Sequence, residues 1–240
     1  GLRFSRTMSG YIGYGYSDNQ YKFDPTALSG IDPTFFESYS KSSVTVSVKY
    51  DSSDDYYLPR MGQTATQSFE YAGPGGDAEF IKSKTDYAKF NGLKDYIGFD
   101  AIVRYKARYF HLFDSGYIPV AERFYMGGIG SIRGFQSYSI SPKYDDANGV
   151  ERRKGGTQTF SNSAELSFPL VPKAKMRLVT FIDYGIIKDD TSGNISRGGY
   201  GVGLEWFSPV GPIQLVFARP IGQEEGDFVA PFEFTMGRRF

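Results

Sequence analysis

Residues 124–136 read Phe-Tyr-Met-Gly-Gly-Ile-Gly-Ser-Ile-Arg-Gly-Phe-Gln and place one arginine, Arg133, in a glycine-rich segment. The segment interrupts a series of alternating strands, and its glycines permit a tight path and a close approach of backbone. A phosphate-binding loop is a weak interpretation, because no Lys-Ser or Lys-Thr pair follows and no helix is predicted there. The stretch therefore predicts a tightly turning loop that presents a single cation between strands.

About ten segments in total, before and after this stretch, alternate apolar and polar residues with a period of two, which is typical of strands with two different faces. In residues 43–50, for example, Val44, Val46, Val48 and Tyr50 alternate with serine, threonine and lysine. The pattern predicts an all-β protein. The predicted strands are residues 3–16, 43–50, 62–72, 79–90, 97–109, 158–168, 174–184, 198–207, 212–219 and 231–240.

The connections between these strands favour a membrane barrel. Outer-membrane barrels have short periplasmic turns, longer outer loops and aromatic residues near the strand ends. A soluble β-sandwich is the alternative, but it usually turns about every 8–12 residues and rarely contains a very long loop. We therefore expect a transmembrane antiparallel β-barrel. The short turns lie at residues 58–60, 91–94, 170–173 and 208–212, and the longer loops at residues 17–41, 111–157, 185–197 and 220–230.

The composition argues against several classes of function. The formal net charge is zero, with 27 basic and 27 acidic side chains, which argues against a nucleic-acid partner. Cysteine is absent and His111 is the only histidine, so cysteine-ligated and histidine-rich metal sites are excluded. No Gly-x-Ser-x-Gly motif occurs, and no apolar run of about 18 residues predicts a membrane helix. We expect no enzymatic activity, no cofactor and no metal.

Five stretches resemble, in the same order, the outer-membrane barrel-assembly insertases. Ile132, Arg133, Gly134 and Phe135 resemble the signature of the long inward-folded loop of that family. The resemblance implies a protein of the bacterial outer membrane that folds and inserts other β-barrels. It also implies three partners: unfolded outer-membrane proteins, accessory assembly lipoproteins and outer-membrane lipid. The other matching stretches are residues 163–169, 181–185, 203–212 and 232–240.

Two carboxylates are predicted to face the barrel lumen on adjacent strands. Apolar side chains take the lipid-facing positions of residues 163–168 and 176–184, which leaves Glu165 and Asp183 inside. Arginine offers a permanently charged fork of donors that matches carboxylates. We expect Arg133 to pin the loop tip against these two residues, as the resemblance also implies. The alternative is three unrelated charges solvated in a wet lumen.

The last predicted strand carries a second hypothesis. Gly237 interrupts it close to the terminal aromatic Phe240, and a glycine inside a strand weakens the ladder or permits a bend. In the family that the sequence resembles, the first and last strands form a weak seam at which substrate strands pair by β-augmentation. The alternative is that Gly237 only relieves crowding in a curved barrel.

The resemblance also sets expectations for the domain organisation. It implies a sixteen-stranded barrel preceded by periplasmic POTRA domains, whereas residues 1–240 contain about ten predicted strands and no soluble domain. We therefore expect the chain to be the C-terminal portion of such a barrel, with residues 111–157 as the inward-folded loop. Two other functions remain open: a two-partner secretion barrel that exports a polypeptide, and a passive porin.

Overall fold

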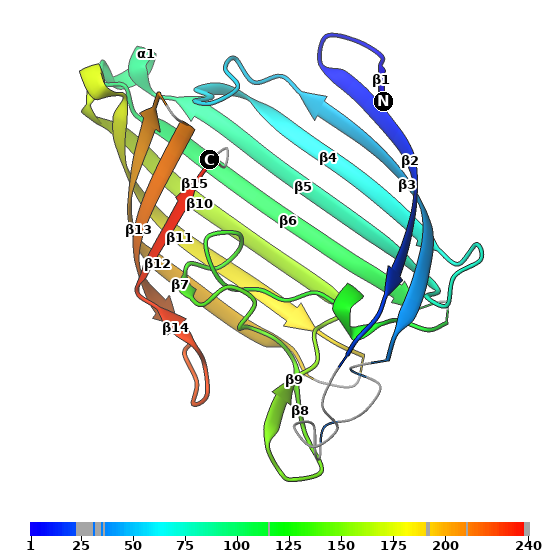
Figure 1. Ribbon diagram of the computed structural model, residues 1–240. Coiled ribbons are helices and arrows are strands. Elements are labelled where there is room, and N and C mark those ends of the chain that lie inside the picture. Colours follow the sequence, from blue (N-terminus) through cyan, green and yellow to red (C-terminus); the bar gives the residue numbers. More distant parts are fainter. Residues whose placement is uncertain are drawn as a thin grey trace.

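Eleven strands form a single antiparallel sheet in the order β1-β2-β3-β4-β5-β6-β10-β11-β12-β13-β15, curved around a concave face (Figure 1). The computed structural model describes residues 1–22, 31, 35, 37–114, 116–190, 193–209 and 211–237. Two small ladders, β7 with β14 and β8 with β9, lie outside this sheet. The strands of the sheet are β1 (Leu2–Arg3), β2 (Met8–Asn19), β3 (Tyr39–Asp51), β4 (Met61–Ala72), β5 (Phe80–Gly92), β6 (Ile102–Asp114), β10 (Gln158–Val171), β11 (Met176–Lys188), β12 (Ile195–Ser208), β13 (Gly211–Ile221) and β15 (Phe232–Met236). The remaining elements are β7 (Gly134–Phe135), β8 (Lys143–Asp145), β9 (Glu151–Arg153), β14 (Val229–Ala230), the helix α1 (Lys94–Ile97) and the 3-10 turns η2 (Val120–Glu122) and η3 (Pro172–Ala174).

The two faces of the sheet are inverted relative to a soluble protein. On β11 the apolar Ile182 and Tyr184 are 55% and 45% exposed, whereas Asp183 between them is 1% exposed. On β12 Tyr200 and Trp206 are exposed and Glu205 is fully buried. Apolar side chains on the convex face and charged ones inside are the arrangement that a lipid surround requires. The predicted all-β, antiparallel barrel architecture is confirmed.

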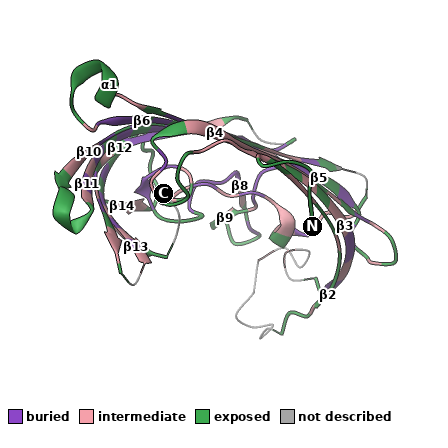
Figure 2. Ribbon diagram, turned by 90° about the horizontal axis from the view of Figure 1, so that it is seen from above, coloured by how far each residue is buried: buried purple, intermediate pink, exposed green. Residues whose placement is uncertain are grey.

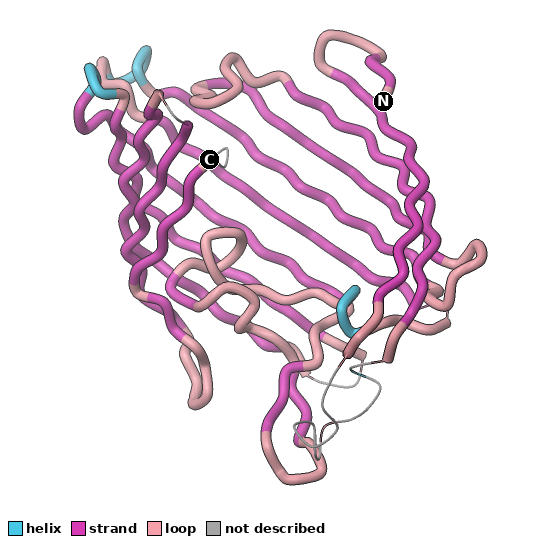
Figure 3. The backbone as a smooth tube through the Cα atoms, viewed as in Figure 1, coloured by secondary structure: helices cyan, strands magenta, loops and turns pink. Residues whose placement is uncertain are grey.

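Several predicted strand boundaries are wrong. The strand expected over residues 97–109 begins at Ile102, because residues 94–97 form the one-turn helix α1, which Gly98 ends in a left-handed conformation. The strand expected over residues 3–16 is split into β1 and β2 by a turn in which Ser5 Oγ accepts hydrogen bonds from the amides of Thr7 and Met8. This split adds the eleventh strand. Figure 3 shows that helical segments are short and lie at strand ends or in the long loop.

The strands also run further than predicted into the polar loops. β6 extends to Asp114 and β11 to Lys188, so the connections expected over residues 111–157 and 185–197 begin later and are shorter. The added residues include the apolar Leu112 and Ile187, which are buried against the inward-folded loop, so the polar-apolar alternation fails there although the backbone ladder continues. At the opposite end, the connections from β10 to β11 and from β12 to β13 are short as predicted.

The sheet is open at its two edges. Within the described residues, β1 pairs only with β2 and β15 pairs only with β13, and no ladder joins the two edges. Both edges therefore present backbone groups that are not paired within the sheet. Among the described residues, no helix has the length and apolarity needed to cross a membrane.

We call the connection between β6 and β10, residues 116–157, the inward loop: much of it lies inside the curve of the sheet (Figure 2), whereas its β8–β9 hairpin projects beyond the ends of the strands (Figure 1). Its ends are fastened by a bridge between Phe124 and Gly156, and its middle is folded by a bridge between Met126 and Ile140. Its segment β7 pairs with β14, which lies just before the closing strand β15. The inward loop thus occupies part of the space that the curved sheet surrounds.

Glycines of β11 and β12 form the seat for the tip of the inward loop. A Cβ at Gly199 would overlap the carbonyl oxygen of Arg133, and a Cβ at Gly185 would lie 2.9 Å from Ile132 Cδ1. Gly134 itself has a φ of +97°, and a Cβ there would lie 3.1 Å from the Arg219 carbonyl carbon. The loop backbone therefore approaches the inner face of the sheet, which we call the wall, more closely at strands β11 to β13 than a side chain at these glycine positions would permit.

We predict that Gly199→Ala displaces the inward loop and destabilises the protein by about 1–3 kcal/mol, because the added methyl overlaps backbone that has no free space. Gly203→Ala is the matched control, since Gly203 lies on the same strand and its Cβ would make only an ordinary contact of 3.4 Å with Leu215 O. Thermal unfolding of the two variants in detergent measures the difference. Equal midpoints would contradict this account of the seat.

Candidate functional site

The predicted loop motif lies at the centre of the concave face. Ile132 and Phe135 are fully buried and pack with Met126, Ile140 and Ile187 in one apolar cluster. This cluster fixes the segment on both sides of the arginine. The guanidinium of Arg133, between Ile132 and Phe135 in the sequence, therefore has a defined position on the wall.

Arg133 makes a two-pronged contact with Asp183. Its Nε lies 2.7 Å from Oδ2 and its Nη2 lies 2.6 Å from Oδ1, and its backbone N–H donates to Oδ2 at 3.0 Å. Arg133 and Asp183 are 5% and 1% exposed. Because both are removed from water, the pairing satisfies groups whose burial alone would be costly.

Two further wall residues complete the shell around Arg133. Its Nη1 lies 2.9 Å from Glu165 Oε1, and its Nη2 donates to Ser163 Oγ at 2.7 Å. The guanidinium carbon lies 3.5 Å from the centroid of the Phe181 ring, which is a stacking distance for a cation on an aromatic face. The structure thus brings the three residues predicted from the sequence into direct contact.

Three charged residues that the sequence analysis did not single out join them. Arg104 on β6 pairs with Glu205 on β12, with Nη2 and Oε1 2.6 Å apart, and its Nε approaches Glu165 Oε2 at 2.9 Å without hydrogen-bond alignment. Lys106 Nζ lies 3.3 Å from Glu165 Oε2. We call this set of six residues the charge cluster: Arg104, Lys106, Arg133, Glu165, Asp183 and Glu205. Three cations and three carboxylates balance within it.

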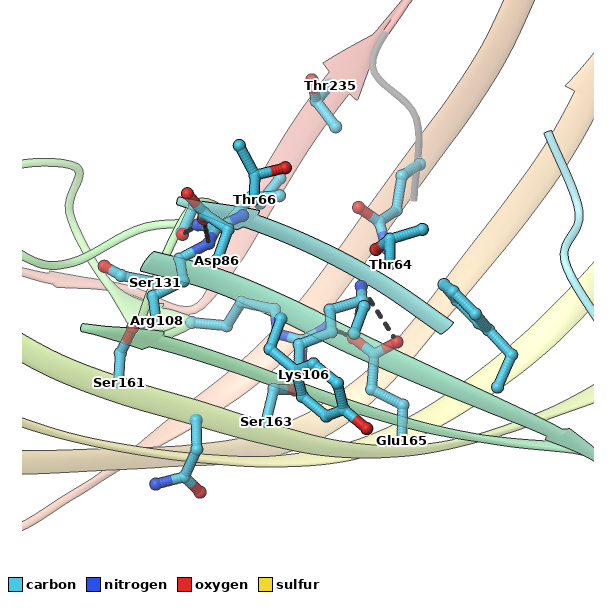
Figure 4. A pocket seen from close by; sticks show the side chains of 18 of the residues that line it. Thr64, Thr66, Asp86, Lys106, Arg108, Ser131, Ser161, Ser163, Glu165 and Thr235 are labelled. Carbon is cyan, nitrogen blue, oxygen red and sulfur yellow. Dashed lines mark hydrogen bonds and ion pairs between the residues drawn. The ribbon is translucent and has the colours of Figure 1, made fainter. Parts of the chain in front are cut away.

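A cavity of about 360 Å³ adjoins the charge cluster, between the loop tip and residues of strands β3 to β6, β10, β13 and β15. Figure 4 shows Lys106 and Glu165 facing each other on its wall, with Ser161, Ser163, Thr64 and Thr66 around them. Arg108 on the same wall donates to the carbonyl of Gly130 in the loop tip. Among the described residues, no group of histidine, cysteine or carboxylate side chains has the arrangement of a metal site.

A second ionic contact, which the sequence analysis did not predict, anchors the start of the inward loop. Glu122 of η2 pairs with Lys82 of β5 and, at 2.8 Å, with Lys41 of β3. Burial alone would raise the pKa of Glu122, but the charge of Lys82 and the hydrogen bond from Lys41 outweigh it, so this pKa lies below its ordinary value. A depressed carboxyl pKa stabilises the fold above the unfolded value of about 4.3, and the stabilisation is lost as the pH falls. The contact is therefore intact at neutral pH.

The predicted closing-strand residues are placed differently. Gly237 does not interrupt β15 but follows its last residue, with a φ of +80°, and its amide donates to Pro212 O at 2.8 Å. Among the described residues, nothing lies within 4 Å of a Cβ built at Gly237, so crowding by them does not explain the glycine, whereas its backbone conformation does. Phe240 lies outside the described residues.

Comparison with known proteins identifies the fold and the family. The family described as "Omp85 superfamily domain" matches residues 1–240. The outer membrane protein assembly factor BamA of Nitratidesulfovibrio vulgaris is 29% identical over 254 residues, which cover 100% of this chain and 31% of the relative. This chain thus spans about a third of that protein.

Two solved structures show the same fold. The crystal structure of BamA from Haemophilus ducreyi lacking POTRA domains 1–3 matches with a TM-score of 0.81 at 21% identity, covering 97% of this chain and 51% of that one. CdiB from Acinetobacter baumannii matches with a TM-score of 0.58 at 14% identity, covering 96% and 39%. The resemblance to the barrel-assembly insertases seen in the sequence is confirmed.

We predict that Arg133→Lys weakens the attachment of the loop tip by about 1–3 kcal/mol, because lysine cannot contact Asp183 and Glu165 together through a planar fork. Hydrogen exchange of the amides in residues 127–136 measures the change. Arg152→Lys is the control, since Arg152 lies in the same inward loop with its side chain 42% exposed. Similar exchange in both variants would show that the fork does not hold the loop.

Proposed function

This chain belongs to the Omp85 superfamily, and from that membership we propose that it forms the barrel of an insertase that folds β-barrel proteins into a membrane. It is a protein of the bacterial outer membrane. The observation that carries the proposal is the match of the whole chain to an outer membrane protein assembly factor. The proposed action needs no covalent step, because the work is the pairing of strands and the transfer of apolar side chains into lipid.

The proposed substrate is an unfolded outer-membrane protein. Its strands carry backbone groups that must be paired before they enter lipid, and an open sheet edge offers such pairing. Within the described residues β15 pairs only with β13, so its other side is free to pair with a substrate strand, which supports a role as the template. Accessory assembly lipoproteins and outer-membrane lipid complete the proposed set of partners.

We further propose that the closing strand forms one side of a seam that opens for substrate. β15 has five residues and pairs with β13 over five register positions, whereas β12 and β13 pair over eleven. Gly237 ends this short ladder in a conformation that a β-branched residue strains. Phe240 keeps its proposed role in the terminal signal of the same strand. That the chain is the C-terminal portion of a sixteen-stranded barrel, preceded by POTRA domains, likewise stays a prediction.

The alternative functions have weaker support. The likeness to CdiB is lower than the likeness to BamA, with TM-scores of 0.58 and 0.81, so the secretion barrel is not favoured. A passive porin needs an open path inside the barrel. The inward loop and the charge cluster occupy part of the space inside the curved sheet (Figure 2), and a porin would give them no role.

We predict that depleting the full-length protein lowers the levels of many unrelated outer-membrane β-barrels, because each would lose its insertion template. Quantitative proteomics of outer-membrane fractions measures the effect. Restoring the wild-type protein or Gly237→Asn recovers the barrels, since asparagine tolerates a left-handed conformation, whereas Gly237→Val does not.

Loss of a single exported protein, with other barrels unchanged, would contradict the insertase proposal and support a secretion barrel. Full recovery by Gly237→Val would contradict only the seam.

A further inference from the structure

The closing strand β15 is held mainly from one side. It pairs with β13, and its outward residues Phe232, Phe234 and Met236 are more than half exposed. Glu233 and Thr235 alternate with them on the inner face. A five-residue edge strand with one neighbour gains little from its own ladder. The inner-face contacts therefore decide how firmly it is held.

Glu233 connects this strand to the tip of the inward loop. Its Oε1 accepts a hydrogen bond from the backbone N–H of Ile129 at 3.2 Å. Gly128, with a φ of +81°, lets the carboxylate approach, since a Cβ there would lie 3.2 Å from the same oxygen. Ile129 also packs against Phe181 and Val216 of the wall. The contact therefore joins the backbone of the loop tip to the side chain of Glu233 on β15.

The loop tip transmits position between this contact and Arg133. Ser131 Oγ accepts a hydrogen bond from the Gly127 amide at 2.8 Å, and the Ser131 amide donates to Gly128 O at 3.0 Å. Residues 127–131 are thus a closed turn, and Arg133 two residues further on is paired with Asp183. A continuous set of short contacts runs from β11 through the loop tip to β15.

The segment just before β15 is tied to the same loop. β14 pairs with β7, and the Gln136 amide donates to Phe228 O at 2.9 Å. Both β14 and β15 therefore contact the inward loop within a few residues of Arg133. Movement of either the loop tip or the closing strand changes contacts of the other.

We propose that Glu233 is a positioning residue that couples the closing strand to the ion pairs of Arg133 with Asp183 and Glu165, so that the seam opens only as the loop tip shifts. This inference rests on the proposed insertase function for its purpose, but the coupling itself is independent of that function. Two elements that share a contact must influence each other's opening equally, because coupling free energies are reciprocal.

Hydrogen exchange of the full-length protein in lipid nanodiscs tests this coupling. We expect Glu233→Leu to speed exchange roughly tenfold in both residues 127–133 and residues 229–237, as loss of a hydrogen bond to a carboxylate predicts. Glu233→Gln keeps an acceptor and stays within about threefold of the wild type. Thr235→Val is the control on the same face and strand, and leaves residues 127–133 unchanged.

A double variant separates coupling from simple damage. Arg133→Lys alone should speed exchange in residues 229–237, but should add nothing further there when combined with Glu233→Leu. Unchanged exchange of residues 127–133 in Glu233→Leu, or additive effects in the double variant, would overturn the proposal. Intact coupling together with failure of the depletion experiment would instead contradict the insertase function alone.

Discussion

The pairing of the Arg133 guanidinium with Asp183 and Glu165 is the interaction on which the interior of this protein depends. The cation is supplied by a loop and the carboxylates by two adjacent strands, so the contact joins segments that no local structure holds together. All are nearly excluded from solvent, where an unpaired charge is strongly destabilising. Arg133, Asp183 and Glu165 together carry one excess negative charge, which the rest of the charge cluster balances. Arg104 pairs with Glu205, and Lys106 pairs with Glu165. The loop cannot leave without exposing this arrangement.

Backbone shape makes the pairing possible. The glycine-rich face of β12 lets the carbonyl of Arg133 lie against the wall, and Gly134 turns the chain toward β13. Larger residues at Gly199 would hold the guanidinium away from Asp183. Glu122 and Glu233 then connect the loop to β3 and β5 and to β15, which lie toward opposite edges of the sheet. The inward loop therefore crosses the concave face and connects the early strands of the sheet to the closing strand.

Much of this could be predicted from the sequence, and the misses have physical causes. Period-two alternation identified the inner face and thus Glu165 and Asp183. It did not reveal that Arg104 lies opposite Glu165, because register between strands leaves no periodic signal. The apolar pair Ile97 and Phe99 fits strand alternation, yet Ile97 ends α1 and Phe99 precedes β6. The contacts of Glu122 and Glu233 depend on the path of a long irregular loop, which alternation does not describe.

The most direct test of this pairing is a double-mutant cycle between Arg133 and Asp183, with loop opening measured by hydrogen exchange of residues 127–136. Removing either partner alone leaves a buried charge, so Arg133→Met and Asp183→Leu should each cost about 3–5 kcal/mol. The double variant should cost much less than the sum of the two. Additive losses would show that the two side chains do not hold the loop through each other, and would contradict the account.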